Sequence, residues 1–414
     1  MEKKSTERIP PSIPTWEDLE SCLRGKLRGW LQDMLEAEVD ELLGRAKSER
    51  RKAVDPEPGY RNGYGKPRKL TLSNGTVVLR RPRVRGVEKR FESRLLPLFV
   101  RRTCGVDNLL PELYLHGLAL GDFDLALRGL LGEDAPISAN TVARLKEKWS
   151  VEWEEWSARR LDELEVVYLW VDGIYVKAGF EKEKAAVLVV LAARSDGSKA
   201  IVALKAGYRE SKEAWAEILR DLKRRGMNCP RLVGGDGNLG IWSALAEVYP
   251  QAQEQRCWNH RIVNAVDRVP KKHQTQALVY LRQIPYAETV AEAERLKSKY
   301  QEWCRKKGLE DAARVLDRDW DRMITFYEFP KEHWRHLRTS NPIESPFSAL
   351  RLRTDAARRF KKIENALAVI WKMMLVAERR FRRLRAPELM KDVYQGVKYV
   401  NGVRATGRSE EAAA

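Results

Sequence analysis

The sequence predicts a mixed α/β protein, with a sheet-containing domain interrupted by an all-helical insertion and preceded by helical and β-hairpin regions. The first observation is a set of three apolar, β-branched runs separated by turn residues, at 166–171, 185–193 and 200–206. The second is an alternation of helical and strand patterns that follows them, at 211–226, 231–235, 241–249 and 253–258. Together they predict a mixed sheet with helices on its faces.

The predicted order is β-β-β-α-β-α-β, in which three meandering strands precede two αβ units. This is the ribonuclease H-like order. Residues 264–335 are polar, rich in Glu, Lys and Arg, and helical in pattern, which indicates an insertion. Residues 336–402 then return to the sheet domain, with a helical pattern at 343–384 that ends in the basic run Arg379–Arg383.

A long amphipathic helix is predicted from Trp16 to Ala46, with leucines and a valine at helical spacing and Thr15 as its cap. Such a helix outside the main domain serves either as a dimerisation element or as a helix that packs on its own chain. The spacing alone favours neither. Residues 1–15 and 403–414 are polar and are expected to be disordered.

A β-hairpin is predicted over residues 68–81, because two β-rich runs flank Ser73-Asn74-Gly75. The basic run that follows supplies four candidate phosphate contacts, Arg80, Arg81, Arg83 and Arg85. Residues 107–149 have the pattern of several short helices, the last one basic and capped by Ser138. They suit a helix-turn-helix or a plain helical subdomain.

Composition favours a polyanionic partner. The 414 residues have a net charge of +18 and a pI near 9.6. The segment 60–102 has thirteen Lys and Arg against two acids, and the segment 345–391 has thirteen against four. Five scattered cysteines suit a reducing compartment. No apolar run approaches the roughly 18 residues that span a membrane, so we expect a cytoplasmic protein associated with the nucleoid.

Three acidic residues are the candidate catalytic groups and metal ligands: Asp172, Asp236 and Glu344. Asp172 follows the first apolar run, Asp236 follows the fourth, and glycine follows each of them. Glu344 lies where Pro342 opens a helical stretch. Carboxylates that converge in a basic chain predict metal-dependent phosphodiester chemistry with two Mg²⁺ ions about 3.5–4 Å apart, for which Mn²⁺ can substitute.

The chain resembles the Mutator-type family of bacterial insertion-sequence transposases. The resemblance covers roughly residues 55–395. It rests on Asp172-Gly173, Asp236-Gly237, the run from Gln255 to His260, and the run from Trp334 to Ser345 that contains Asn341-Pro342-Ile343-Glu344. Gly234-Gly235 depart from the family's usual serine or threonine before the second aspartate, and Pro346-Phe347 depart from its frequent Leu-Asn.

The resemblance implies a DDE transposase that binds the terminal inverted repeats of its own element and uses target double-stranded DNA. It implies Mg²⁺-dependent strand cleavage that frees a 3′-hydroxyl, followed by strand transfer. The triad maps onto Asp172, Asp236 and Glu344, and the Cys-x-x-His signature maps onto Cys257 and His260. Coupled joining of two ends predicts a homodimer. A nuclease that cuts without joining and a DNA-binding regulator with a dead catalytic site are the alternatives.

Two smaller groups of residues each have two interpretations. Cys257 and His260 are either structural residues near the site or half of a zinc site, although no second pair has the usual spacing. Trp334, with His336 and Arg338, either stacks on a DNA base or belongs to the protein core. Arg351 and Arg353, in the second basic segment, are further candidate DNA contacts.

The predicted division of the chain has seven parts: a helical region at 1–49 that is a candidate for dimerisation, a basic β-hairpin region at 50–105, a helical, helix-turn-helix-like DNA-binding region at 106–160, the first catalytic part at 161–263, the helical insertion at 264–335, the last catalytic part at 336–402, and a tail at 403–414.

Overall fold

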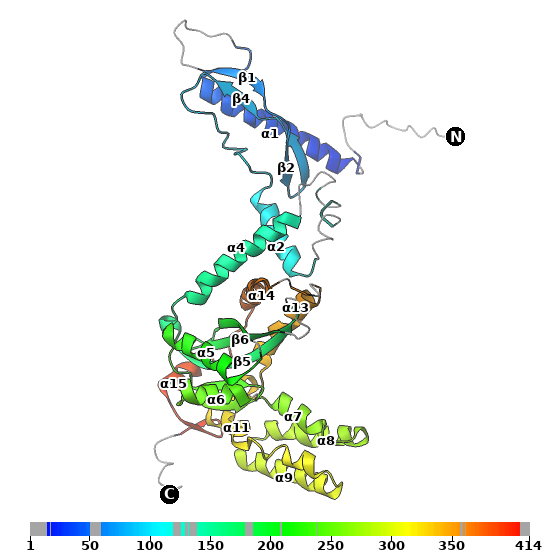
Figure 1. Cartoon of the computed structure of the whole chain (residues 1–414), viewed down its shortest axis with the longest axis vertical. Helices are drawn as coiled ribbons and strands as arrows, with labels where there is room; N and C mark the ends of the chain where they lie inside the picture. Colours follow the sequence, from blue (N-terminus) through cyan, green and yellow to red (C-terminus); the bar gives the residue numbers. More distant parts are fainter. Residues whose placement is uncertain are drawn as a thin grey trace, which may run out of the picture. The chain divides into compact units, whose positions relative to one another are not determined.

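The chain folds into two compact units, Met1–Leu145 and Lys146–Ala414 (Figure 1). The computed structural model describes residues 15–16, 18–49, 59–118, 126–128, 131, 139–178, 185–207, 209–237, 239–356, 359–360 and 362–405. Each unit is described below by itself. The seven-part division remains a prediction.

The first unit is built around helix α1 (Leu19–Leu43) and two small antiparallel sheets. Strand β1 (Tyr60–Tyr64) pairs with β4 (Pro82–Arg85), and β2 (Arg68–Leu72) pairs with β3 (Gly75–Leu79), which confirms the predicted hairpin. The α1 side chains of Leu31 and Leu35 share a core with those of the hairpin. The apolar stripe of α1 therefore packs on its own chain.

Two features of α1 differ from expectation. Asp18, not Thr15, occupies the N-cap position, and the Thr15 hydroxyl donates to the Asp18 carboxylate at 2.8 Å. Leu23 and Trp30 of the predicted helix are 52% and 58% exposed, so the helix keeps a second apolar strip outside the core.

Helices α2 (Cys104–Leu115) and α4 (Ala139–Ala158) lie in the predicted helical region. α4 continues well beyond the predicted end of the last short helix. Part of the stretch predicted as several short helices, 107–149, lies outside the described residues, as does the Ser138 cap, so the helix-turn-helix remains a prediction.

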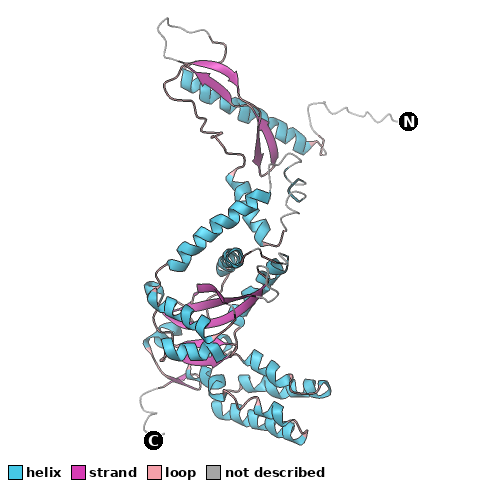
Figure 2. Ribbon diagram, in the orientation of Figure 1, coloured by secondary structure: helices cyan, strands magenta, loops and turns pink. Residues whose placement is uncertain are grey.

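A five-stranded mixed sheet forms the centre of the second unit (Figure 2). Its order is β7-β6-β5-β8-β9, and its strands are β5 (Val166–Val176), β6 (Ala185–Arg194), β7 (Lys199–Gly207), β8 (Leu232–Gly235) and β9 (Gln253–Arg256). Strands β5, β6 and β7 pair antiparallel, whereas β8 pairs in parallel with β5 and β9. The predicted β-β-β-α-β-α-β order is confirmed.

Helices cover the sheet. Helices α5 (Lys212–Arg224) and α6 (Leu239–Val248) share a core with one face, and Ser211 caps α5 by accepting from the Ala214 N–H at 3.2 Å. Helix α13 (Asn341–Ala356) contacts β5 and β6, and α14 (Ile363–Glu378) contacts β7. The prediction of helix up to residue 384 was wrong, because α14 ends at Glu378 and the basic run continues as a turn and coil.

Helices occupy the stretch predicted as an insertion, and the first of them begins at Trp258, before the predicted start at residue 264. These helices are α7 (Trp258–Val266), α8 (Lys271–Gln283), η2 (Ile284–Tyr286), α9 (Val290–Lys306), α10 (Glu310–Arg314), α11 (Trp320–Ile324) and η3 (Thr325–Glu328). The short helices η4 (Lys331–His333) and α12 (Trp334–Leu337) lead back to α13. A further short helix, η1 (Asp162–Leu164), precedes β5.

A small hairpin near the C-terminus fastens the insertion to the rest of the second unit. After α15 (Leu389–Gln395), β10 (Tyr399–Val400) pairs with β11 (Val403–Arg404), so the disorder predicted from residue 403 is wrong for these two residues. The Asn401 carboxamide oxygen accepts from the first N–H of α9, on Val290, at 3.0 Å. The Gly402 N–H donates to the Tyr327 carbonyl at 3.0 Å.

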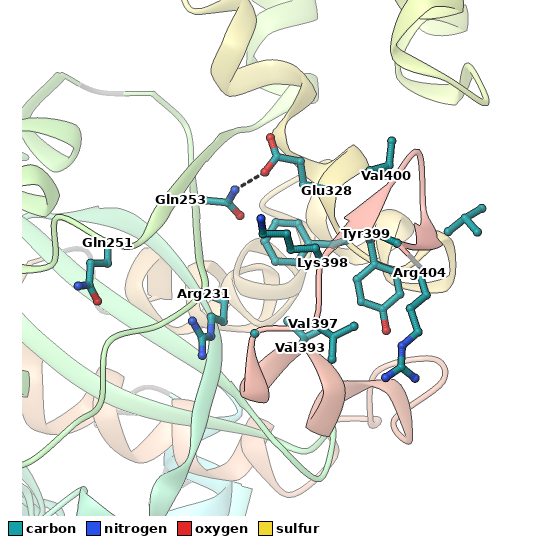
Figure 3. A pocket seen from close by; sticks show the side chains of 14 residues that line it. Arg231, Gln251, Gln253, Glu328, Val393, Val397, Lys398, Tyr399, Val400 and Arg404 are labelled. Carbon is teal, nitrogen blue, oxygen red and sulfur yellow. Dashed lines mark hydrogen bonds between the residues drawn. The ribbon is translucent and has the colours of Figure 1, made fainter. Parts of the chain in front are cut away.

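A cavity of about 1010 Å³ lies between this hairpin and the starts of β8 and β9 (Figure 3). Arg231 and Gln253 line it from the sheet side, and Tyr399 and Arg404 line it from the hairpin. It lies at the opposite ends of β8 and β9 from Asp236. No helix among the described residues has the length and apolar character needed to cross a membrane.

Candidate active site

Asp172 lies inside strand β5, whereas the sequence predicted it at a strand end. The strand continues to Val176 because its antiparallel pairing with β6 persists, with Asp172 opposite Val189. The parallel pairing with β8 ends at Trp170 and Gly234. Asp172 therefore lies just beyond the last parallel pair, where β5 and β8 are no longer paired.

The pleat determines which way Asp172 points. Successive side chains of a strand alternate between faces. Leu169 and Val171 belong to the core shared with α5 and α6. Asp172 therefore projects to the other face, together with Trp170, whose indole N–H donates to the His336 carbonyl at 3.0 Å. That contact brings the segment leading to Glu344 to the same face.

Asp236 follows β8 directly, at the carboxyl end of the strand beside β5. The next residue, Gly237, has a φ of +91°, a left-handed conformation that a side chain would strain. A Cβ at Gly237 would also collide with the Arg256 side chain, so the Asp236-Gly237 pair forms a tight turn against β9.

Glu344 lies in the first turn of α13, where a negative charge suits the helix dipole. The Ser340 hydroxyl, which is buried, donates to its carboxylate. Ile343 is fully buried beside it, which fixes the orientation of this turn. The three candidate acids thus come from a strand, a turn after a strand, and a helix start.

The charges of these acids act on one another. The pKa of Asp172 is raised to about 7, mainly by burial and also by the charges of Asp236, Glu210 and Glu344, while the Gly173 N–H, which donates to it at 2.8 Å, opposes the shift. A carboxyl group surrounded by carboxylates is unfavourable without a cation. The arrangement is chemically suited to hold a divalent metal.

Cys257 and His260 lie beside Glu344. The Cys257 N–H donates to the Gly235 carbonyl at 2.7 Å, and its thiol accepts from the Ser340 N–H at 3.3 Å. The His260 Nδ1 lies 3.8 Å from a Glu344 carboxylate oxygen. Hydrogen bonding to Cys257 raises the pKa of His260 to about 9, so the imidazole is a cation near the acids at neutral pH.

The side chains predicted to hold a DNA base are engaged within the protein. Trp334 is 4% exposed, donates from its indole to the Phe329 carbonyl at 2.9 Å, and contacts the rings of Phe326 and Tyr327 edge-on. The His336 Nε2 accepts from the Arg385 N–H at 3.2 Å. This geometry favours the core interpretation of Trp334 over base stacking.

Arg338 also makes protein contacts. Its guanidinium donates to the Pro285 carbonyl at 2.6 Å and lies 4.3 Å from the ring centre of Tyr286. Arg353 is 3% exposed, which does not suit a phosphate contact, whereas Arg351 is exposed. In the first unit, Arg80, Arg83 and Arg85 are exposed and Arg81 is half-buried.

Comparison with known proteins identifies the family. Residues 4–382 match the family described as Transposase, Mutator family. The chain belongs to the Mutator family of transposases.

Relatives of this transposase support that assignment. A transposase for insertion sequence element IS6120 of Mycolicibacterium smegmatis is 42% identical over 297 residues, which cover 72% of this chain and 92% of that protein. A transposase for insertion sequence element IST2 of Acidithiobacillus ferrooxidans is 35% identical, covering 68% and 95%. A transposase for ISRM5 of Rhizobium meliloti is 31% identical, covering 84% and 85%.

Among solved structures, the transposase resembles a chain of the Drosophila P element transposase strand transfer complex. The TM-score is 0.30 at 11% identity, covering 70% of this chain and 84% of that one. At this level the likeness supports no argument about the site.

Sequence reasoning missed one acid near the site, Glu210. It is 8% exposed, accepts from the Tyr175 hydroxyl at 3.0 Å, and its carboxylate lies where a Cβ at Gly173 would be. The absence of a side chain at Gly173 thus leaves the space that Glu210 fills. The signal available in the sequence was the position of Glu210 directly before Ser211, the cap of α5. A residue in that position resembles part of an ordinary solvated turn.

One metal-ligating group was also underestimated. Ligand atoms of Cys257, His260 and Glu344 lie within 4.8 Å of one another. Glu344 is thus a third candidate ligand beside the Cys257-x-x-His260 pair, one fewer than the four ligands of a structural zinc site. Glu344 belongs both to this group and to the predicted carboxylate triad.

Proposed function

We propose that this transposase has a ribonuclease H-like catalytic domain in which Asp172, Asp236 and Glu344 cleave DNA and transfer the cut strand. The observation that supports this most strongly is geometric: Asp172 lies just past the last β5–β8 pair, Asp236 follows β8, and Ser340, which donates to Glu344, is bonded through Cys257 to the end of β8. The three acids come from three separate parts of the sequence, so their association is a property of the fold.

The strand order supports the ribonuclease H-like assignment. Three antiparallel strands are followed by two parallel ones, which extend the sheet from β5. Asp172 on β5 and Asp236 after β8 occupy neighbouring strands. The helical insertion separates Asp236 from Glu344 and returns the chain to the same face at α13.

The donor set suits Mg²⁺, because Asp172, Asp236 and Glu344 offer the oxygen ligands that this ion prefers. Two bound Mg²⁺ ions would activate the attacking oxygen and stabilise the leaving oxygen of the phosphodiester. Mn²⁺ accepts the same ligands and is expected to substitute.

The neighbours of the acids position them. Ser340 holds one Glu344 oxygen, and Cys257 holds Ser340 in turn, so the helix start is fixed to the end of β8. The His260 imidazolium offsets part of the negative charge and is placed to donate a hydrogen bond to a phosphate oxygen. This role, rather than a zinc site, is the one we assign to the Cys257-x-x-His260 pair.

The DNA partners follow from the family. Relatives are transposases for insertion sequence elements, so the terminal inverted repeats of this chain's own element, together with target DNA, are the proposed partners. The exposed Arg80, Arg83 and Arg85 of the first unit are suited to phosphate contacts during end recognition.

A homodimer would hold two element ends together. The exposed Leu23, Trp30 and Met34 of α1 lie on one side of that helix, at spacings of seven and four residues. We expect Trp30→Ala to lower self-association in sedimentation without lowering the melting temperature, whereas the buried Leu35→Ala should lower the melting temperature.

Cleavage and strand-transfer assays with oligonucleotides carrying the element end test the catalytic proposal. Asp172→Asn, Asp236→Asn and Glu344→Gln should each abolish cleavage in Mg²⁺ while leaving end binding largely intact, because basic side chains supply that affinity. Glu217→Gln, an exposed acid on α5, serves as the matched control and should cleave normally.

Normal cleavage by folded Asp236→Asn protein would contradict the triad assignment. Cleaved ends without strand-transfer products would instead assign a nuclease that cuts without joining. Binding without any cleavage in Mg²⁺ or Mn²⁺ would assign a catalytically inactive DNA-binding regulator.

A further inference from the structure

A small basic cavity lies beside the segment that leads to Glu344. Its volume is about 350 Å³, and it lies between η2 of the insertion and the short helices η4 and α12. Tyr286, Arg335, Arg338 and Arg385 line it. Nothing in the proposed chemistry so far uses these side chains.

Tyr286 offers an aromatic surface there. Its side chain is 71% exposed, which is unusual for a ring in an otherwise well-packed region. The Arg338 guanidinium lies over the ring at 4.3 Å and is itself fixed by donating to the Pro285 carbonyl. The ring is therefore supported from the protein side and remains largely open to solvent.

The cavity has more cations than acids, because Lys331, Arg335, Arg338 and Arg385 line it against Glu288 and Glu332. Arg335 and Arg385 are exposed, and neither forms an ion pair with any described residue. Lys331 is already paired, since its ammonium lies 3.2 Å from Glu288. Two guanidinium groups without ion pairs therefore lie beside an exposed aromatic ring. Proteins that bind single-stranded nucleic acid combine cationic contacts to its phosphate backbone with stacking of its bases on aromatic rings.

The cavity is connected to the candidate active site through a short segment. The Arg338 carbonyl accepts from the Trp258 N–H at 2.9 Å, next to Cys257. Two residues later, Ser340 binds the Glu344 carboxylate. Glu344 lies six positions after Arg338, so a fully extended chain would span at most roughly 20 Å between them. A DNA strand end at the acids can therefore reach the cavity within a few nucleotides.

We propose that Tyr286 binds an unpaired nucleotide of the DNA strand that is processed at the acids. The base stacks on the open face of Tyr286, and Arg335 and Arg385 contact the adjoining phosphates. This inference rests on the proposed function, because it takes the processed DNA strand as the occupant. The larger cavity at the other end of the sheet has no comparable platform, since its Tyr399 is 6% exposed.

The test uses the full chain in metal-free buffer, so that binding is measured without cleavage. The probe is a single-stranded oligothymidine of about 20 nucleotides that carries one 5-iodouracil. Irradiation followed by peptide mass spectrometry should locate a crosslink at Tyr286. In fluorescence anisotropy, Tyr286→Ala should weaken binding by about tenfold, within the range that stacking of one base supplies, while Tyr286→Phe stays within about twofold.

Val279→Ala is the matched control, because Val279 is a comparably exposed apolar residue on α8 of the same insertion, at 57%. Arg335→Ala with Arg385→Ala should reduce the salt dependence of binding. Unchanged affinity in Tyr286→Ala, with crosslinks elsewhere, would overturn the proposal. Unchanged affinity with weakened self-association would assign Tyr286 to a protein contact and overturn it equally.

These outcomes are separate from those of the catalytic proposal. If the triad variants lose cleavage but Tyr286→Ala binds the probe normally, only the nucleotide site fails. If Asp236→Asn cleaves normally, the triad assignment fails, and the crosslink at Tyr286 remains an independent measurement of strand binding.

Discussion

Trp334 is anchored on both its ring and its N–H, and these contacts decide what its loss would do. Its indole contacts Phe326 and Tyr327 and donates to the Phe329 carbonyl. Trp334→Ala should therefore lower the free energy of unfolding by about 3–5 kcal/mol, as large-to-small core substitutions do. Trp334→Phe should lose less, because it retains most of the ring contacts. Thermal unfolding measures both variants, and slowed cleavage with an unchanged melting temperature would instead support base stacking.

His336 gives the second unit a predictable pH dependence. Burial lowers the pKa of His336 to about 4, below its ordinary value of 6.5. Between these two values the unfolded chain binds a proton that the folded protein does not, so stability falls as pH falls through that window. The loss reaches at most roughly 3 kcal/mol by pH 4. Denaturant unfolding between pH 7 and about 4 measures it.

His336→Gln should flatten this pH dependence, whereas replacement of the exposed His116 should leave it unchanged. An equal slope in His336→Gln and the parent protein would contradict the assignment to His336.

At the residue scale, the candidate acids can be predicted from the sequence more readily than the residues around them. Asp172 and Asp236 are detectable because each follows an apolar run and precedes glycine, and the family resemblance adds Glu344. Glu210 is not detectable in that way, because its proximity to Asp172 depends on a turn folding back over Gly173. The role of Trp334 could not be decided either, since an aromatic residue among cations occurs both in cores and at DNA surfaces.

At the level of elements, periodicity locates strands and helices but not their full extent. The five strands of the main sheet appear in the predicted order. The end of β5 was misplaced because its pairing with β6 continues past the polar Asp172, and tertiary pairing overrides the local signal there. The short β10–β11 hairpin was missed because its strands have two residues each, too few for a pattern.

The β10–β11 hairpin offers a test of how it is attached to helix α9. Asn401 has a φ of +47° and accepts the N–H of Val290 at the start of α9. Asn401→Gly keeps the backbone conformation but loses this bond, which should cost about 1 kcal/mol. Asn401→Ala loses the bond and adds backbone strain, so it should cost more. Hydrogen exchange of the Val290 amide should rise in both variants, and an unchanged rate would contradict the contact.

For the whole molecule, the proposed function predicts different tasks for the two units. The first unit has a basic hairpin region with exposed arginines, and the second has the acids. Arg83→Ala and Arg85→Ala should each reduce the slope of log affinity against log salt by roughly one for element-end DNA, without changing the cleavage rate at saturation. Arg314→Ala, an exposed arginine of the insertion, is the charge-matched control. Identical slopes in all three variants would place the phosphate contacts elsewhere.

The β10–β11 hairpin, which bonds to the start of α9, also has a consequence for the order in which a newly made chain can fold. A chain emerges from the ribosome with its N-terminal parts first, and those parts begin to fold early. The strands that position Asp172 and Asp236 are complete by Arg256, whereas Glu344 is made only after the helical insertion. The loop that fastens the insertion, at Asn401 and Gly402, comes later still. Under the proposed assignment, a nascent transposase therefore lacks one of the three acids until Glu344 has been made, and the hairpin that fastens the insertion is made after it.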